Sequence, residues 1–432
     1  MRDPLGSIRI SATTVHRRLY QPLPQDHFLR TDAAAKLVEH KQLVPFEFVS
    51  DTEILSPRVP FVTYPHEWCN AQFVDAAELT LALSETVLQS GYELKDASAW
   101  NVIFDGCRPV FCDHLSFQRV ADRRWWAFAQ YIRHFILPLC LAKYRRLNAG
   151  ASFAISRDGI DPDLGRGLMG MRRFLTRYWL LLLTPRAGTL AASAPDAGSA
   201  NTNHKNLYGM TRWLLDGVRN VRRSKSTWLN YTAERSHYTA NASDAKYRVV
   251  GAWLAACAPQ WVVDLGCNTG EFSRLAASAG AQVVAIDLDH ESVQALYLSN
   301  QGERIYPVVA NFDDLSGGRG WGGAEFPGLL TRLAQHADLL MMLAVVHHLA
   351  ISSAIPYAAI AATAAGLTSR YLIIELLDER DPLVQQLATQ RSRSPAEFSI
   401  SLQRAAFEHH FQVREVIEIS ESSRQLLLME KK

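Results

Sequence analysis

Short apolar runs alternate with amphipathic stretches along the second half of the chain. Residues 261–263 are apolar and are followed by an acid and a glycine-containing turn, and residues 272–279 have the spacing of a helix. A second apolar run, 283–286, also ends at an acid. Short apolar runs separated by one helical stretch predict a β-α-β unit of an α/β domain.

The same pattern continues to the end of the chain. The last two apolar runs are separated by a serine-rich turn, which predicts an antiparallel strand pair. Further strands are predicted at 305–310, 338–344, 370–375, 411–419 and 424–429.

The first turn of this domain has the residues of a nucleoside-binding loop. Gly266 and Gly270 allow the backbone to approach a ligand closely, and Asp287 ends the second strand, where a carboxylate can accept hydrogen bonds from ribose hydroxyls. Asp264 and Glu271 would repel a pyrophosphate, so the turn favours a cationic ligand. The alternative is an ordinary strand-to-helix connection in which Asp264 caps the helix.

Residues 225–432 resemble the class I S-adenosylmethionine-dependent methyltransferases, whose first motif has the form of Val-Asp-Leu-Gly-Cys-Asn-Thr-Gly at 263–270. The resemblance implies a Rossmann-like, seven-stranded methyltransferase sheet and S-adenosyl-L-methionine as cofactor. It also implies that the methionine end of the cofactor faces Asp264, Asn268 and the backbone from Gly266 to Gly270. In this family an acid such as Asp287 holds the ribose, and a residue after the third strand, here Asn311 or Asp313, flanks the adenine.

Two further parts of the pocket are predicted. The resemblance implies that a segment before the first strand closes over the cofactor, where Tyr238 and Tyr231 could contact the sulfonium; packing against the sheet is the alternative. His347 and His348 follow the fourth strand, at the end of the sheet where ligands bind, and His348 is our preferred general base. A helix cap or a pocket-lining role is the alternative, and Glu375 is another pocket candidate.

The first half carries a second pattern. Asp96, Asn101 and Asp113 have the spacing of a kinase catalytic loop and its metal-binding aspartate, so this half resembles a kinase-like, mostly helical α+β domain with helices at 76–90 and 124–144. Asn101 and Asp113 would be metal ligands only if this site is active. No glycine-rich phosphate loop precedes them, and Lys36 and Lys41 match the kinase lysine only by position. A degenerate kinase fold is the alternative.

The amino-acid composition limits the classes of partner and the cell compartment that we expect. The net charge is +2, no basic tract interleaved with aromatic residues was identified, and nucleic acid is not indicated. Six cysteines without a CxxC pair favour free thiols, and no apolar run is long enough to span a membrane, so we expect a cytoplasmic protein.

These patterns predict three regions: a kinase-like domain at 1–183, a flexible linker at 184–204 that is rich in small residues, and a methyltransferase domain at 205–432. The arrangement resembles nodulation-type and polysaccharide-locus methyltransferases, which implies methyl transfer to oxygen or nitrogen of a small-molecule or glycan acceptor. The first domain would recruit substrate or a protein partner. The alternatives are a bifunctional phosphotransferase and methyltransferase, or a non-catalytic scaffold.

Overall fold

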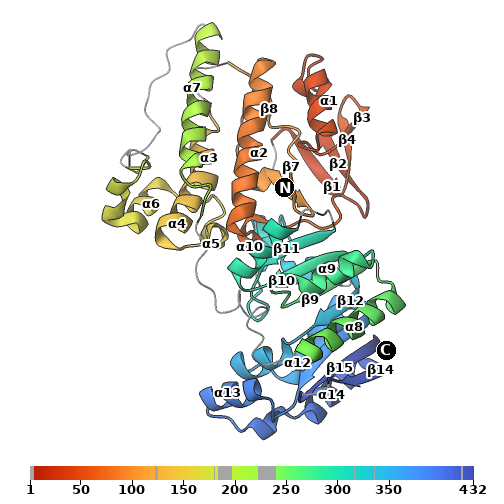
Figure 1. Cartoon of the computed structure of the whole chain (residues 1–432). Helices are drawn as coiled ribbons and strands as arrows, with labels where there is room; N and C mark the ends of the chain where they lie inside the picture. Colours follow the sequence, from red (N-terminus) through yellow and green to blue (C-terminus); the bar gives the residue numbers. More distant parts are fainter. Residues whose placement is uncertain are drawn as a thin grey trace. The chain divides into compact units, whose positions relative to one another are not determined.

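The chain divides into two compact units, Met1–Ser224 and Lys225–Lys432. The computed structural model describes residues 4–121, 125–179, 181–182, 197–221, 240–300, 302, 304–315, 317–334, 336–419 and 422–432. Figure 1 shows both units, coloured along the sequence.

The second unit is built on one mixed sheet of seven strands. Its order is β11-β10-β9-β12-β13-β15-β14, in which β15 runs in the direction opposite to the other six strands. The strand order reverses between β9 and β12, and this reversal creates a binding crevice at the carboxyl ends of the strands. The strands are β9 (Trp261–Leu265), β10 (Gln282–Asp287), β11 (Ile305–Val309), β12 (Ala337–Met342), β13 (Thr368–Leu377), β14 (Phe411–Glu418) and β15 (Arg424–Lys431).

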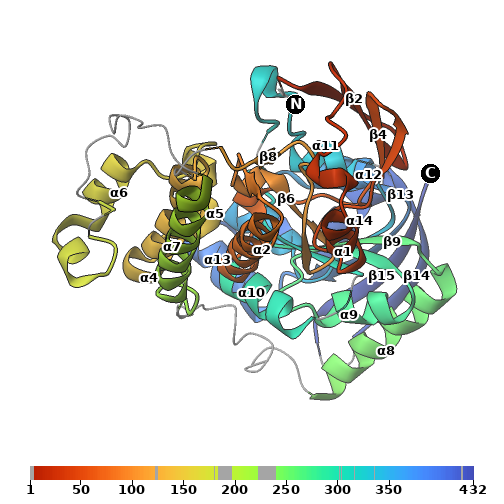
Figure 2. The same ribbon diagram turned by 90° about the horizontal axis from the view of Figure 1, so that it is seen from above.

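Helices cover both faces of this sheet (Figure 2). α8 (Ala240–Cys257), α9 (Glu271–Ser278) and α10 (His290–Ser299) pack on one face, where every second strand residue joins a buried core. α12 (Tyr357–Leu367) and α14 (Ile400–Glu408) pack on the other face. The remaining elements are α11 (Leu329–Leu333), α13 (Pro382–Gln390), the 3-10 helices η6 (Trp321–Gly323) and η8 (Pro395–Phe398), and the π-helical turn η7 (His348–Ser352).

The strands expected from the apolar runs are present to within two residues at most boundaries. The closing antiparallel pair is also present, with Phe411 opposite Lys431 and Glu418 opposite Gln425. Helix starts follow local chemistry: the Asp289 side chain accepts a 3.1 Å hydrogen bond from the backbone N–H of Ser292 and begins α10. The α/β architecture is therefore the one that the sequence predicts.

The first unit combines small sheets with a group of helices. α2 (Asn70–Gln89) and α7 (Ala197–Asp216) lie side by side (Figures 1 and 2). The other helices are α1 (Asp32–Glu39), α3 (Phe128–Tyr131), α4 (Leu137–Arg145), α5 (Ala149–Ile155) and α6 (Pro162–Met169), with the 3-10 helices η1 (Phe28–Arg30), η2 (Pro65–Glu67), η3 (Ala99–Asn101) and η5 (Gly170–Leu175) and the π-helical turn η4 (Ile132–Ile136).

The strands of the first unit form one four-stranded sheet and two strand pairs. The four-stranded sheet has the order β1-β2-β4-β3, and β5 pairs with β8 and β6 with β7. The strands are β1 (Gly6–Ile10), β2 (Thr14–Leu19), β3 (Glu47–Ser50), β4 (Glu53–Pro57), β5 (Tyr92–Leu94), β6 (Val102–Asp105), β7 (Arg108–Phe111) and β8 (Phe117–Arg119). The sequence did not predict the four-stranded sheet, because its strands are short and contain no continuous apolar run. The buried residues of these strands are Gly6, Arg17, Leu19, Ile54 and Ser56.

The boundary between the units lies at residue 224 rather than at residue 204. α7 begins inside the predicted linker and belongs to the first unit, because it packs on α2. The Arg212 guanidinium of α7 pairs with the Glu85 carboxylate of α2 at 2.6 Å. Residues 184–196 of the predicted linker lie outside the described residues.

Candidate functional site

The turn after β9 has a backbone that requires glycine at two positions. Gly266 has φ +74°, and a Cβ there would lie 2.3 Å from Cγ2 of Val345. Gly270 has φ +81°, and a Cβ there would lie 2.3 Å from Cδ1 of Leu296. Asn268, between them, has φ +49°. The turn is thus both left-handed and closely packed, so a side chain is excluded for two separate reasons.

Asp287 closes β10 beside this turn. Its carboxylate accepts hydrogen bonds from the backbone N–H groups of Asn268 at 2.7 Å and Asp289 at 2.8 Å. Burial raises the pKa of this carboxyl, and the two amide hydrogen bonds oppose that rise. Each carboxylate oxygen keeps a lone pair after accepting one amide hydrogen bond, so Asp287 can accept further hydrogen bonds from a ligand.

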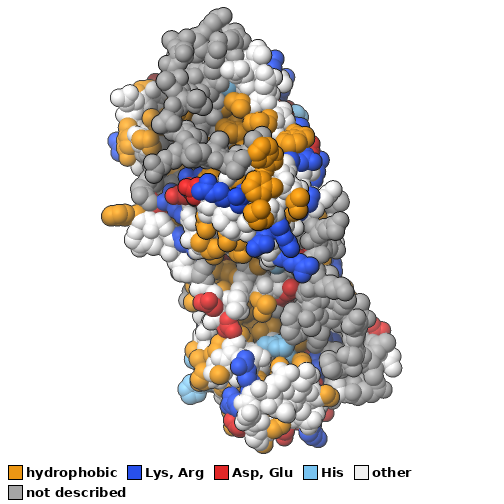
Figure 3. All heavy atoms as spheres, turned by 90° about the vertical axis from the view of Figure 1, so that its left-hand side faces the viewer, with side chains coloured by type: hydrophobic (Ala, Val, Ile, Leu, Met, Phe, Trp, Pro, Cys, Tyr) orange, Lys and Arg blue, Asp and Glu red, His pale blue; other side chains and the backbone are white. Residues whose placement is uncertain are grey.

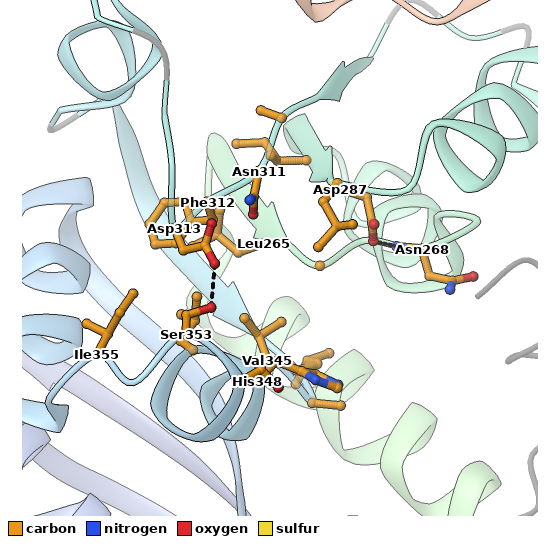
Figure 4. A pocket seen from close by; sticks show the side chains of 18 of the residues that line it. Leu265, Asn268, Asp287, Asn311, Phe312, Asp313, Val345, His348, Ser353 and Ile355 are labelled. Carbon is orange, nitrogen blue, oxygen red and sulfur yellow. Dashed lines mark hydrogen bonds between the residues drawn. The ribbon is translucent and has the colours of Figure 1, made fainter. Parts of the chain in front are cut away.

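A cavity of about 650 Å³ opens at the carboxyl ends of β9, β10, β11 and β12 (Figure 4). This volume is in the range of small-molecule and cofactor sites. The lining residues are Leu265, Gly266, Asn268, Ile286, Asp287, Leu288, Ala310, Asn311, Phe312, Asp313, Leu343, Ala344, Val345, His348, Leu349, Ser352, Ser353, Ile355 and Arg391.

Asn311 and Asp313 both line the cavity, so the structure brings together the two alternatives that the sequence left open. The Ser353 hydroxyl, which follows η7, donates a hydrogen bond to the Asp313 carboxylate. Figure 4 shows this contact joining the loop after β11 to the chain after η7. Phe312, Ser353 and Arg391 belong to irregular segments without periodicity, so no pattern in the sequence pointed to them.

Asp264 and Gly270 are not among the residues that line this cavity. The Asp264 carboxylate is buried and accepts a 2.5 Å hydrogen bond from the Ser273 hydroxyl of α9. Burial raises its pKa to about 6. Asp264 therefore connects β9 to α9. This role resembles the alternative in which Asp264 caps the helix, except that the donor is the Ser273 side chain and not a backbone N–H. Tyr238 and Tyr231 lie outside the described residues.

The two histidines after β12 have different surroundings. His348 lines the cavity, and burial together with the nearby positive charge of Arg424 lowers its pKa to about 4. His347 is buried, does not line the cavity, and its pKa is well below the ordinary value, first because of burial. The two rings have centroids 4.2 Å apart. Of the pair, His348 is the residue that can meet a ligand.

A buried network of charges lies beside these histidines. The Lys246 ammonium of α8 contacts one carboxylate oxygen of Glu375 at 2.6 Å, and the Arg424 guanidinium lies 3.5 Å from the other. Arg424 also pairs with the carboxylate of Asp381 at 2.8 Å. Glu375 is fully buried and does not line the cavity, so its carboxylate joins α8 to β13 and β15.

The three kinase-like residues of the first unit lie on either side of the β6–β7 hairpin, Asp96 and Asn101 before it and Asp113 after it. Asn101 ends η3, and its carbonyl accepts a 2.8 Å hydrogen bond from the N–H of Cys112, next to Asp113. The Asp96 backbone exchanges hydrogen bonds with the Ser116 hydroxyl. The Asp113 carboxylate pairs with the Arg17 guanidinium of β2 at 3.3 Å, and both side chains are largely buried.

Within the described part of the chain, no group of three or more His, Cys, Asp or Glu side chains is arranged to hold a metal ion. The Asp113 carboxylate pairs with Arg17 in this arrangement, so a magnesium ion there would share the carboxylate with that guanidinium. Lys36 lies on α1 and Lys41 follows that helix, whereas the cation paired with Asp113 is the Arg17 guanidinium of β2.

The strand order, the glycine turn and the cavity at the carboxyl ends of the strands define a doubly wound α/β domain with a cavity at the crevice where ligands of such domains bind. No family model matches the chain. Over 409 residues the chain is 28% identical to nodulation protein NoeA of Rhizobium meliloti (strain 1021), covering 85% of this chain and 84% of that protein.

Two solved structures are also similar to the chain. Magnesium protoporphyrin IX methyltransferase (ChlM) from Synechocystis PCC 6803, with bound SAM, is 17% identical, with a TM-score of 0.33 over 56% of this chain and 100% of that chain. The bifunctional kinase-methyltransferase WbdD is 19% identical, with a TM-score of 0.31 over 43% of this chain and 39% of that chain. The nodulation-type resemblance drawn from the sequence is confirmed by NoeA, and both solved structures are of methyltransferases.

Proposed function

We propose that the chain is an S-adenosyl-L-methionine-dependent methyltransferase that acts on oxygen or nitrogen of a small or carbohydrate-like acceptor. The observation that carries this proposal is the position of Asp287 at the rim of a nucleoside-sized cavity, beside a glycine turn whose backbone must stay bare. The resemblance of 263–270 to the first methyltransferase motif adds the identity of the cofactor.

The residues of the cavity fit this cofactor. Asp287 can accept hydrogen bonds from ribose hydroxyls, and Asn311 and Asp313 offer polar atoms to an adenine. Asp287 and Asp313 also give the cavity carboxylates that favour a positively charged ligand. When bound, S-adenosylmethionine would supply an electrophilic methyl group.

The protein's own part in the reaction is orientation and proton removal. His348 lines the cavity and, because its pKa is about 4, carries a neutral imidazole throughout the physiological range. A ring nitrogen of that imidazole can accept the proton that an acceptor hydroxyl or ammonium group loses as its new bond to carbon forms. The burial of His347 beside it fixes the second ring away from the cavity, so we assign the proton transfer to His348 alone.

A titration of the full chain with S-adenosylmethionine by calorimetry tests the proposal. We expect micromolar binding, on the order of −8 kcal/mol, that is weakened at least about tenfold in Asp287→Ala, a loss of about 1.4 kcal/mol. Asp314→Ala is the matched control, because Asp314 is an exposed acid that does not line the cavity. Absence of binding by the wild type, or equal binding by Asp287→Ala, would count against the cofactor site.

The second candidate is a phosphotransferase activity of the first unit, in addition to methyl transfer. It is favoured by the loop that brings Asn101 next to the segment of Asp113. Nucleotide binding that requires magnesium and is lost in Asp113→Ala would support it. Unchanged nucleotide binding in that variant would remove it and leave the first unit with a recruiting role for substrate or a protein partner.

A further inference from the structure

The segment from residue 170 to 179 turns its large apolar side chains outward. Thr176 and Tyr178 are buried, whereas four apolar side chains of the same segment are exposed. Three of these side chains belong to the 3-10 helix η5, and the fourth, Trp179, follows it after Thr176, whose extended backbone ends the helix. The exposed fractions are 76% for Met171, 48% for Phe174, 88% for Leu175 and 40% for Trp179.

α7 extends this apolar surface. Trp213 is 51% exposed, and the Arg177 guanidinium lies over its ring at 4.5 Å. The Tyr178 hydroxyl donates a 2.8 Å hydrogen bond to the carbonyl of Leu214, which holds the segment against the end of α7. The apolar side chains of two elements therefore form one surface, which we call the basic-apolar surface: Met171, Phe174, Leu175, Trp179 and Trp213, with Arg172 and Arg177.

Positive charge surrounds these apolar side chains. Residues 140–179 contain eight lysines and arginines against three aspartates, a net charge of +5 in a chain whose total is +2. Arg172 donates a 3.1 Å hydrogen bond to the carbonyl of Tyr144 and so lies beside the exposed Arg145 and Arg146. Figure 3 shows hydrophobic side chains gathered beside lysine and arginine side chains on the face that carries α6 and α7.

Exposed apolar side chains together with positive charge favour one kind of binding partner over others. A second copy of the chain would bring two net-positive surfaces together, which costs free energy. A nucleic acid would leave Met171 and Leu175 unused, because aliphatic side chains do not stack on bases as aromatic rings do. An anionic membrane surface uses both features: apolar side chains enter the boundary between headgroups and acyl chains, and arginines remain among the phosphates.

We propose that the basic-apolar surface docks the protein on anionic phospholipid membranes. The contact would be peripheral. In the part of the chain that the structure describes, no helix combines the length and the apolar character that crossing a membrane requires. The proposal is independent of methyl transfer, because none of these residues lines the cavity of the second unit.

Co-sedimentation of the full chain with vesicles tests this proposal. We expect binding to vesicles that contain phosphatidylglycerol, little binding to pure phosphatidylcholine vesicles, and release as salt is raised. Met171→Glu/Leu175→Glu should weaken the partition at least about tenfold, because both apolar anchors become charged. Arg172→Gln/Arg177→Gln should weaken it about 25-fold, since each basic residue near an anionic surface contributes about fivefold.

Leu402→Glu is the matched control, because Leu402 is an exposed leucine on α14 outside the basic-apolar surface, and it should bind vesicles like the wild type. Circular dichroism melting of each variant checks that the fold is retained. Wild-type protein that ignores anionic vesicles at low salt would overturn the proposal. So would folded Met171→Glu/Leu175→Glu protein that binds vesicles normally, or self-association that this variant abolishes while vesicle binding is absent.

Discussion

Replacing Glu375 by glutamine should destabilise the second unit strongly. The side chain keeps its size, but the carboxylate between Lys246 and Arg424 loses its charge. Arg424 retains the Asp381 carboxylate at 2.8 Å, whereas the buried ammonium of Lys246 loses the carboxylate oxygen that lies 2.6 Å away. One glutamine amide cannot accept hydrogen bonds with both ends, so an N–H₂ group must face one of the two cations.

The magnitude follows from the burial of the whole network. Removing one partner of a buried ion pair costs about 3–5 kcal/mol, because the remaining charge stays out of water. Glu375 and Arg424 are fully buried and Lys246 is nearly so, so the cost expected for a buried ion pair applies here and the small cost of a surface pair does not. For a unit of this size the loss corresponds to a fall in melting temperature of roughly 6–20 °C.

Amide hydrogen exchange of peptides from β13 and β15 measures this loss inside the second unit, whatever the first unit does. Glu397→Gln is the control, because the Glu397–Arg393 pair is solvent-exposed, and it should leave exchange in β13 and β15 unchanged. Adding Lys246→Met to Glu375→Gln should restore part of the protection, because the uncompensated cation is removed. A loss below about 1 kcal/mol in Glu375→Gln would refute the reasoning, since it would mean that the network is hydrated.

Three other perturbations test the site. Gly266→Ala should abolish cofactor binding in calorimetry because its Cβ would strike Val345. Gly280 also has a positive φ, +104°, but has open space around its position, so Gly280→Ala should bind the cofactor normally. Because burial raises the pKa of Asp264 to about 6, the stability it contributes is present below pH 4 and is lost as the pH rises through 6. Asp264→Asn should therefore be more stable than the wild type by up to about 3 kcal/mol in urea at pH 8, with equal stability near pH 4. Since the pKa of His348 is about 4, kcat/KM should stay level down to about pH 5. His348→Ala should slow turnover without weakening cofactor binding. A fall of kcat/KM centred near about pH 6.5 would contradict the assignment of His348 as the base.

The order of elements in the second unit could be predicted from the sequence because each buried strand is a compact apolar run. The glycine turn at 266–270 and the acid at 287 predict the position of the binding crevice, because both can be recognised from the local sequence. Ser353 and Arg391 could not be predicted, because irregular loops bring them to the cavity after long intervals of sequence. The charge network of Lys246, Glu375 and Arg424 could not be predicted either, because its members come from α8, β13 and β15, which are far apart in the sequence.

The first unit shows a different limit of the sequence. The spacing of Asp96, Asn101 and Asp113 is local and could be read directly, but their surroundings are set by Arg17, almost a hundred residues away from Asp113 along the chain. The basic-apolar surface was also missed. Met171-Arg-Arg-Phe-Leu-Thr-Arg-Tyr-Trp179 is a basic tract interleaved with aromatic residues, but only exposure shows that its apolar side chains face solvent.

Asp264 and Asp287 show how position within a strand decides the role of an acid. Both follow apolar runs, and in the sheet Asp264 lies opposite Ala285, two residues before Asp287 on the same strand. Asp264 is still inside the sheet, flanked by β10 and β12, and its carboxylate accepts a hydrogen bond from the Ser273 hydroxyl of α9, the helix that covers this face. Asp287 is the last residue of β10 and lines the cavity. Its carboxylate accepts hydrogen bonds from the backbone amides of Asn268 and Asp289 and also faces the cavity. A ligand of the cavity should therefore shift the titration of Asp287 much more than that of Asp264, because only the Asp287 carboxylate can exchange part of its surroundings for ligand hydroxyls.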